Sequence, residues 1–169
     1  GIYTILQGTL AASANYVLTY VGNQLTITPT WLTAQANNQS RSYGTTNPVL
    51  TISYSGFMGS DGVTNLSVLP QASTAAQSNS PVGEYEITVT GGSATNYLII
   101  PLNGKLTVTA ANLTVTANNA SRACGATNPV FTGAITGIQN GDDITANYTT
   151  TATTTSPVGT YPIVPTLVD

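Results

Sequence analysis

Apolar and polar side chains alternate along several short segments of this chain, with a period of two residues. In residues 84–90, Tyr85, Ile87 and Val89 fall on one side, and charged or hydroxyl residues fall on the other. This alternation is typical of a β-strand with one buried face. It predicts strands at 16–21, 25–28, 32–36, 49–55, 84–90, 97–101, 106–109, 113–116, 130–136, 146–151 and 160–164.

No segment shows the 3.6-residue period of an amphipathic helix. Pairs of turn-forming residues separate the expected strands, and Asn103-Gly104 is the strongest hairpin signal, which predicts that 97–102 pairs with 105–109. A short helical turn is allowed at 71–77 or near 37–43. The pattern therefore predicts an all-β or mostly β fold, with mainly antiparallel pairing.

The chain also repeats itself. Residues 37–49 read NNQSRSYGTTNPV and residues 118–130 read NNASRACGATNPV, an offset of 81 residues. A second motif, Ser-Pro-Val-Gly-x-Tyr-x-Ile, occupies 80–87 and 156–163 with an offset of 76, so the later copy is five residues shorter between the two markers. A fixed long period indicates tandem copies of one supersecondary unit.

The repeat boundaries divide the chain into three segments. Gly1, Gly83 and Gly159 hold the same repeat position, so the chain starts inside a repeat. We expect residues 1–28 to be the last strands of a preceding or donated unit, 29–110 to be one complete repeat, and 111–169 to be a repeat lacking its last two strands. Units of about 80 residues bury small cores, so we expect neighbouring units to stabilise one another in an elongated array.

Composition narrows the class of function. Only 5% of the residues are charged, the net charge is −3, and the three bases are Arg41, Lys105 and Arg122. This balance argues against nucleic-acid binding, and the absence of an apolar run of about 18 residues argues against a membrane span. The single cysteine, Cys124, has no partner for a disulfide within the chain. The low charge and the many Thr and Asn residues favour a secreted, extracellular protein.

The residues needed for most catalysis are missing. The chain has no His, so no Ser or Cys nucleophile has an imidazole partner. Glu84 and Glu86 lie on one strand face, where two carboxylates would serve a glycosidase, but their counterparts in the later copy are Thr160 and Pro162. We therefore expect no enzyme activity, no cofactor and no metal site.

Charged residues recur at two repeat positions. Arg41 and Arg122 share one position, and Asp61 and Asp142 share another. In a chain with so few charges, this coincidence predicts structural ion pairs within each repeat, Arg41 with Asp61 and Arg122 with Asp142.

Three aromatic residues are candidates for stacking on sugars. Trp31 stands where the later copy has Asn112, so the fold does not require it. Tyr20 and Tyr54 are the other two candidates. Tyrosines that repeat, such as Tyr85 and Tyr161, are better explained as core residues.

Three motifs together resemble a known family. They are Tyr43-Gly-Thr-Thr-Asn-Pro48, the Ser-Pro-Val-Gly-x-Tyr-x-Ile motif at 80–87 and 156–163, and Asn96-Tyr97 followed by Gly-x-Leu-Thr-Val-Thr at 104–109. They look like the MBG repeats, "mostly beta, glycine-rich" modules of large bacterial surface and adhesin-like proteins. The chain departs from that pattern at Cys124, where Tyr is usual. The resemblance implies structural or adhesive roles and no catalytic residues.

Two functions remain open from the sequence. The first is a structural repeat unit of an extracellular bacterial filament, stalk or surface array, joined head to tail to further copies or neighbouring repeats by β-strand complementation. The alternative is an adhesin segment that binds a glycan or a protein at the cell surface.

Overall fold

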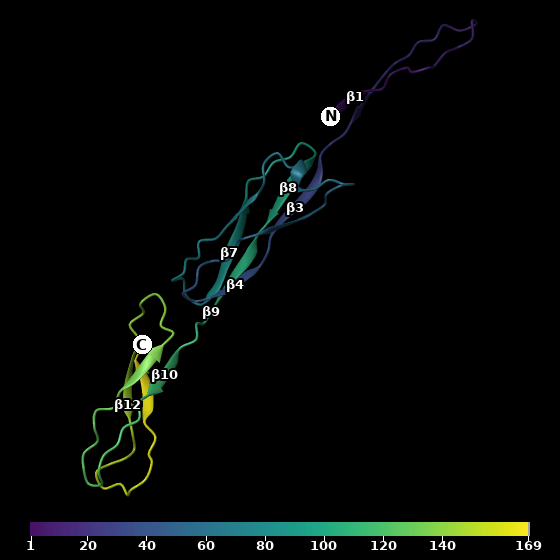
Figure 1. Ribbon diagram of the computed structural model, residues 1–169. Helices are drawn as coiled ribbons and strands as arrows, with labels where there is room; N and C mark the ends of the chain where they lie inside the picture. Colours follow the sequence, from purple (N-terminus) through teal and green to yellow (C-terminus); the bar gives the residue numbers. More distant parts are fainter. Residues whose placement is uncertain (169) are drawn as a thin grey trace. The chain divides into compact units, whose positions relative to one another are not determined.

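The computed structural model describes residues 1–168, and it contains thirteen strands and a single 3₁₀ turn (Figure 1). The strands are β1 (Ile2–Thr4), β2 (Gln24–Thr26), β3 (Thr30–Ala36), β4 (Gln39–Ser42), β5 (Ile52–Ser55), β6 (Gln71–Ser73), β7 (Gly83–Thr90), β8 (Tyr97–Leu102), β9 (Gly104–Thr109), β10 (Thr114–Ala117), β11 (Gly133–Thr136), β12 (Thr145–Thr149) and β13 (Val164–Val168). The 3₁₀ turn, η1, spans Val63–Asn65. The predicted all-β fold is confirmed.

Most strands lie where the alternation placed them, but several details differ, and the alternation did not predict β1. Residues 16–21 form no strand, and the strand expected at 160–164 begins only at Val164. The helical turns allowed at 71–77 and near 37–43 are wrong, because these segments contain the strands β6 and β4. Both strands are short, and they are defined by backbone hydrogen bonds to a neighbouring strand. Side-chain alternation along so few residues does not reveal such pairing.

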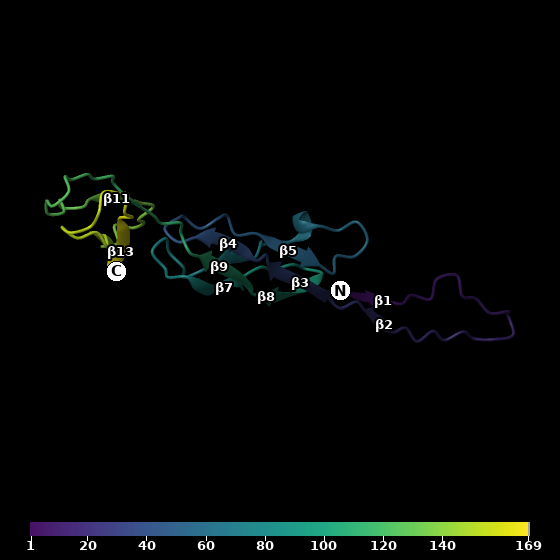
Figure 2. The ribbon, with the colours of Figure 1, turned by 90° about the horizontal axis from the view of Figure 1, so that it is seen from below.

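The predicted hairpin at Asn103-Gly104 is also wrong. β8 belongs to a sheet of order β5-β3-β8, whereas β9 belongs to a sheet of order β4-β9-β7-β6 (Figure 2). β3 pairs in parallel with β8, and β4 pairs in parallel with β9. The chain therefore passes through Asn103 from one sheet into the other. Pairing is mainly antiparallel, as predicted, because β1–β2, β3–β5, β6–β7, β10–β11 and β12–β13 are antiparallel, whereas the β3–β8 and β4–β9 pairs just described are parallel.

Asparagine side chains explain why these residues do not turn back. Asn38 Oδ1 accepts a hydrogen bond from the Lys105 N–H at 2.8 Å, and Asn103 Oδ1 accepts one from the Val89 N–H at 3.0 Å. These side chains replace backbone partners where the strands change sheets. At Gly104, an added Cβ would lie 2.5 Å from the Ala36 carbonyl oxygen, so the close approach of the two chains requires glycine.

The chain forms two compact units, and these are not the sequence repeats. Unit 1 comprises Gly1–Asn37, Leu50–Ser73 and Ile87–Gly104, and unit 2 comprises Asn38–Val49, Thr74–Glu86 and Lys105–Asp169. The boundary cuts through the middle repeat, 29–110. The buried residues of unit 1 are Leu32, Ala34, Ala36, Ile87, Val89 and Tyr97, and those of unit 2 are Arg41, Ala76, Leu106 and Val108.

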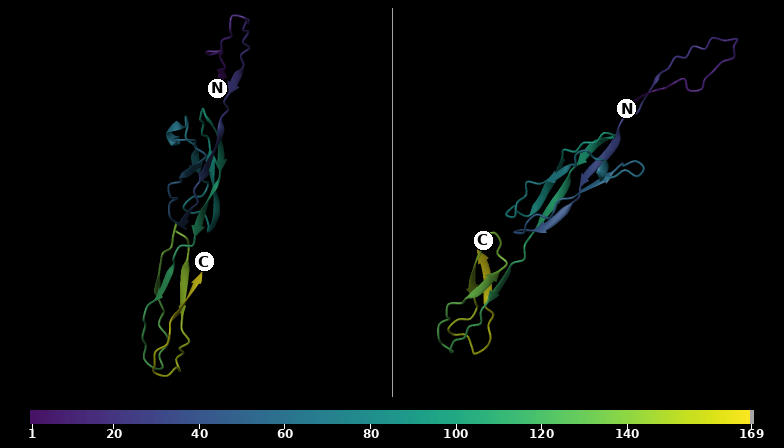
Figure 3. Two further views of the ribbon diagram at one scale, coloured as in Figure 1. Left: turned by 90° about the vertical axis from the view of Figure 1, so that its right-hand side faces the viewer. Right: turned by 45° about the horizontal axis from the view of Figure 1, so that its top comes forward.

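The N-terminal segment contributes almost nothing to either core. Within unit 1, β1 and β2 pair antiparallel, with Tyr3 opposite Leu25, and a long loop joins them (Figure 3). Every residue of 1–31 is exposed except Tyr20, which is half-buried. In unit 2, the C-terminal repeat pairs β10 with β11 and β12 with β13, and β10 lies against β13.

Candidate functional site: the arginine–asparagine bridge and the open groove

An arginine–asparagine bridge, Arg41 with Asn47, lies at the centre of the repeated motif. The Arg41 Nε–H donates to Asn47 Oδ1 at 2.7 Å, and its two terminal nitrogens donate to the carbonyl oxygens of Ser42 and Gln77. Asn47 Nδ2 in turn donates to the Ala76 carbonyl at 2.6 Å. Arg41 is only 8% exposed, and these bonds hold its charge without a carboxylate.

The C-terminal repeat builds the same bridge. The Arg122 Nε–H donates to Asn128 Oδ1 at 2.7 Å, and the guanidinium also donates to the carbonyl oxygens of Ala123 and Thr153. Asn128 Nδ2 donates to the Ala152 carbonyl at 2.8 Å. The two bridges therefore match donor for donor, although the second arginine is less buried.

The segments held by the bridge repeat their hydrogen bonds as well. Thr74 Oγ1 donates to the Glu86 carbonyl, and Thr150 Oγ1 donates to the Pro162 carbonyl. The hydroxyl of Tyr85 donates to the Pro81 carbonyl at 2.8 Å. Tyr161 does the same to Pro157 at 3.0 Å. The second motif, Ser-Pro-Val-Gly-x-Tyr, is thus a turn closed by its own tyrosine, which corrects the interpretation of these tyrosines as core residues.

The predicted Arg–Asp ion pairs are not formed among residues 1–168. Arg41 and Arg122 bind asparagine and backbone oxygens, while Asp61 and Asp142 bind tyrosine hydroxyls. Six residues after each arginine, the motif repeats an asparagine that sequence reasoning missed. Its amide both accepts from the guanidinium and donates to a carbonyl, which a carboxylate is unable to do.

Asp61 and Tyr97 form a second polar contact, in unit 1. The Tyr97 hydroxyl donates to Asp61 Oδ2 at 2.6 Å and accepts from the Met58 N–H at 3.0 Å. Its ring packs edge-on against Phe57, with ring centroids 5.5 Å apart. The hydrogen bond to the Asp61 carboxylate raises the pKa of Tyr97 above its ordinary value, and the Met58 N–H partly opposes this rise.

Asp142, the counterpart of Asp61, has a different tyrosine partner. The Tyr43 hydroxyl donates to Asp142 Oδ1 at 3.1 Å, within unit 2. Within residues 111–168 no tyrosine holds the repeat position of Tyr97, and the hydrogen bond to Asp142 comes from the preceding repeat instead.

The three aromatic candidates for sugar stacking lie in different surroundings. Trp31, on β3, is 65% exposed. Tyr54 packs against Phe57, and burial raises its pKa, while the Tyr20 hydroxyl donates to the Ile5 carbonyl. No ring contact joins the three among the described residues.

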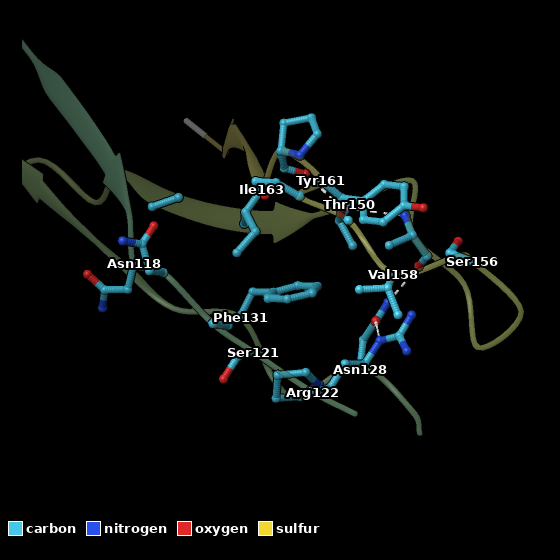
Figure 4. A pocket seen from close by; sticks show the side chains of 18 of the residues that line it. Asn118, Ser121, Arg122, Asn128, Phe131, Thr150, Ser156, Val158, Tyr161 and Ile163 are labelled. Carbon is cyan, nitrogen blue, oxygen red and sulfur yellow. Dashed lines mark hydrogen bonds between the residues drawn. The ribbon is translucent and has the colours of Figure 1, made fainter. Parts of the chain in front are cut away.

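The C-terminal repeat contains a groove of about 650 Å³, within unit 2. Figure 4 shows the side chains of Phe131 and Ile163 on facing sides of it, with Arg122 and Asn128 at its edge. Ala117, Ala152 and Ile163 line this groove, and their counterparts Ala36, Ala76 and Ile87 are fully buried in the middle repeat. Positions that form the core in one repeat are therefore open in the other.

Other chemistry is sparse in the part of the chain that the structure describes. Lys105 and Glu84 form the one ion pair of residues 1–168, at 2.6 Å, and both side chains are well exposed. Cys124 is an exposed free thiol. Over these same residues we find no group of three potential metal ligands and no helix long and apolar enough to span a membrane.

The repeated strands, the bridge and the Tyr-Gly turn define an all-β protein built from tandem repeats. The sequence matches the family described as MBG domain (YGX type) at residues 32–107 and 113–169, so the chain belongs to that family and the predicted resemblance is confirmed. No curated protein and no solved structure matches the chain.

Proposed function

We propose that this chain is a structural repeat unit of an extracellular bacterial filament, stalk or surface array, joined head to tail by β-strand complementation. One observation carries the proposal: the same repeat positions are buried in one copy and exposed in the next. Leu106 and Val108 on β9 are 0% and 1% exposed, whereas their counterparts Leu25 and Ile27 are 54% and 55% exposed.

The groove of the C-terminal repeat supports the same proposal, because it is the site that would accept the donated strands. In the middle repeat, β3 pairs with both β5 and β8, and β9 lies between β4 and β7. Within residues 111–168, β10 pairs with β11 and β13 pairs with β12, so each strand has one edge without a partner in these residues. Such edges add a strand from another chain readily. A head-to-tail contact of this kind propagates and builds an array.

The N-terminal segment, residues 1–28, and the groove of the C-terminal repeat carry complementary repeat positions. Residues 1–28 carry the counterparts of β8 and β9, and residues 111–168 contain no counterpart of these two strands. Burying Leu25 and Ile27 in the groove would stabilise the joint by about 1.5–3 kcal/mol for each fully buried side chain. An extended array on the outside of a cell agrees with the low charge of the chain and with its membership of a family of tandem repeat domains.

The test is the state of assembly of the purified chain as its concentration rises. We expect light scattering after size-exclusion chromatography to show growing oligomers, and electron microscopy to show strings of repeats. The double variant Leu25→Asp, Ile27→Asp should remain monomeric. Leu10→Asp is the matched control, because Leu10 is equally exposed but lies in the β1–β2 loop, outside the strand counterparts. A monomer at every concentration, or oligomers that survive the double substitution, would contradict the proposal.

A second candidate, an adhesin segment that binds a glycan or a surface protein, is favoured by one feature. Trp31 is a large aromatic ring, 65% exposed on β3, and its indole offers an apolar face on which a sugar ring can stack. A glycan array would test this function, with Trp31→Ala as the variant expected to lose binding. Unchanged binding by that variant would remove the only feature that supports it.

A further inference from the structure

We infer that residues 15–28 of a second copy enter the groove of the C-terminal repeat in a single register, the register of β8 and β9 in the middle repeat. The inference rests on the proposed joining by strand complementation, and it adds which side chains meet. It makes three commitments: two apolar side chains fill the groove, residues 120–123 become a strand, and Tyr16 binds Asp142.

The first commitment follows from the core of the middle repeat. Leu106 and Val108 are buried in unit 2, beside the buried residues Arg41 and Ala76. Arg122 and Ala152 hold the equivalent positions and line the groove. Leu25 and Ile27 therefore take the places of Leu106 and Val108.

The second commitment follows from the pairing of β4. In the middle repeat β4 is held in parallel by β9, with Ser40 opposite Thr107 and Ser42 opposite Thr109. The equivalent residues 120–123 form no strand, although the Arg122 bridge already fixes them in place. What they lack is the neighbouring strand. In the joined state Ser121 lies opposite Thr26, and Ala123 lies opposite Thr28.

The incoming strand must leave its own neighbour. In the free chain β2 pairs with β1, and in the middle repeat β9 lies next to β7. The segment that begins at Gly1 and the segment that begins at Gly159 hold the same repeat position as β7. In the joined state, the segment that begins at Gly159 of the accepting copy therefore takes the place of β1 beside residues 24–26 of the entering copy. The two segments hold equivalent repeat positions, so one strand is exchanged for its counterpart.

The third commitment concerns a tyrosine and a carboxylate. Tyr97 is buried and donates to Asp61 Oδ2, whereas its counterpart Tyr16 is 75% exposed. Asp142, the counterpart of Asp61, accepts at Oδ1 from Tyr43. A carboxylate accepts at both oxygens, so Asp142 receives Tyr16 of the second copy while it keeps Tyr43.

Disulfide trapping tests the register with two separate chains, each also carrying Cys124→Ser. One chain carries Thr26→Cys and the other carries Ser121→Cys, and they are mixed and mildly oxidised. We expect a covalent dimer, because the two residues become neighbours across parallel strands. Thr28→Cys with Ser121→Cys is the shifted control, because residues two positions out of register lie too far apart to bridge without backbone movement.

Tyrosine removal tests the third commitment. Tyr16→Phe should weaken association on the order of tenfold to a hundredfold, the worth of a hydrogen bond to a charged group. Tyr43→Phe is the comparison, because it removes the other bond to Asp142. The effect of Tyr16→Phe should vanish when Asp142 is replaced by Ala and persist when Tyr43 is replaced by Phe.

The outcomes separate this inference from the proposed function. Failure of the parent chain to associate would overturn both. Association with equal trapping of the matched and shifted cysteine pairs would overturn the register while leaving strand complementation intact. Association unaffected by Tyr16→Phe would overturn the third commitment.

Discussion

Arg41 and Asn47, six residues apart, are joined through Nε and Oδ1 at 2.7 Å, and Arg122 and Asn128 repeat this bond at the same distance. The bond closes the turn at Tyr43-Gly44 in one repeat and at Cys124-Gly125 in the other. Each asparagine then binds the carbonyl of an alanine, Ala76 or Ala152, well along the chain. The bridge therefore ties together two parts of each repeat that the chain itself separates.

Removal of Arg41 should destabilise the middle repeat. Arg41→Ala leaves Asn47 and the Gln77 carbonyl without this donor, and we expect the free energy of unfolding to fall by about 2–4 kcal/mol. Circular dichroism of the strands during denaturant unfolding measures the change, because the single tryptophan, Trp31, lies in unit 1 and Arg41 lies in unit 2. Arg122→Ala is the matched control, since it breaks the same bridge in the other repeat. An unchanged midpoint for Arg41→Ala would show that the bridge is dispensable.

Stability should fall in alkali partly through Tyr97. Asp61 raises the pKa of Tyr97 in the folded chain above the ordinary value of 10.0. The folded state therefore binds this proton more tightly than the unfolded state. The resulting stabilisation is complete below about pH 10 and is lost as the pH rises through the folded pKa. Asp61→Asn should move the tyrosinate absorbance of Tyr97 to lower pH, with Tyr97→Phe identifying its share of the titration. Identical titrations for the parent chain and Asp61→Asn would refute this coupling.

Gly104 should tolerate no side chain. An added Cβ would lie 2.5 Å from the Ala36 carbonyl oxygen and 3.1 Å from the Ala36 Cβ, where the backbones at Gly104 and Ala36 approach closely. We expect Gly104→Ala to lower the free energy of unfolding by about 1–3 kcal/mol. Gly62→Ala is the control, because nothing lies within 4 Å of its added Cβ. Thermal melts of the two variants provide the comparison, and equal melting temperatures would contradict the expectation.

The Lys105–Glu84 ion pair should contribute little, despite its 2.6 Å separation. Its side chains are 63% and 59% exposed, so water and salt screen the attraction. We expect Glu84→Gln to change the free energy of unfolding by less than about 1 kcal/mol. Repeating the measurement at about 1 M salt should remove even that difference. A loss as large as that of Arg41→Ala would mean that the pair has a structural role.

Strand positions followed from side-chain alternation because alternation reports which face of a strand is buried. β7 is the clearest case, since Ile87 and Val89 are buried and their neighbours are not. The partner of each strand lies outside this signal. Asn103-Gly104 has the composition of a hairpin turn, yet the chain continues through it into a different sheet. Asn38 and Asn103 accept hydrogen bonds from the backbone where β8 ends and β9 begins.

The repeated arginines show the same limit at the site. Repetition alone identified Arg41 and Arg122 as structural residues, but charge counting assigned them to Asp61 and Asp142. The true partner, an asparagine, carries no charge and was hidden among many other asparagines.

By itself, then, the sequence determined the all-β class, the tandem repeat and the positions at which its copies correspond, because these depend on local alternation and on identity between segments. Only the tertiary structure decided which strands pair, where each arginine binds, and that Leu25 and Ile27 are exposed while Leu106 and Val108 are buried. The physical reason is that pairing and burial depend on neighbours distant along the chain, so equivalent repeat positions acquire different surroundings in different copies.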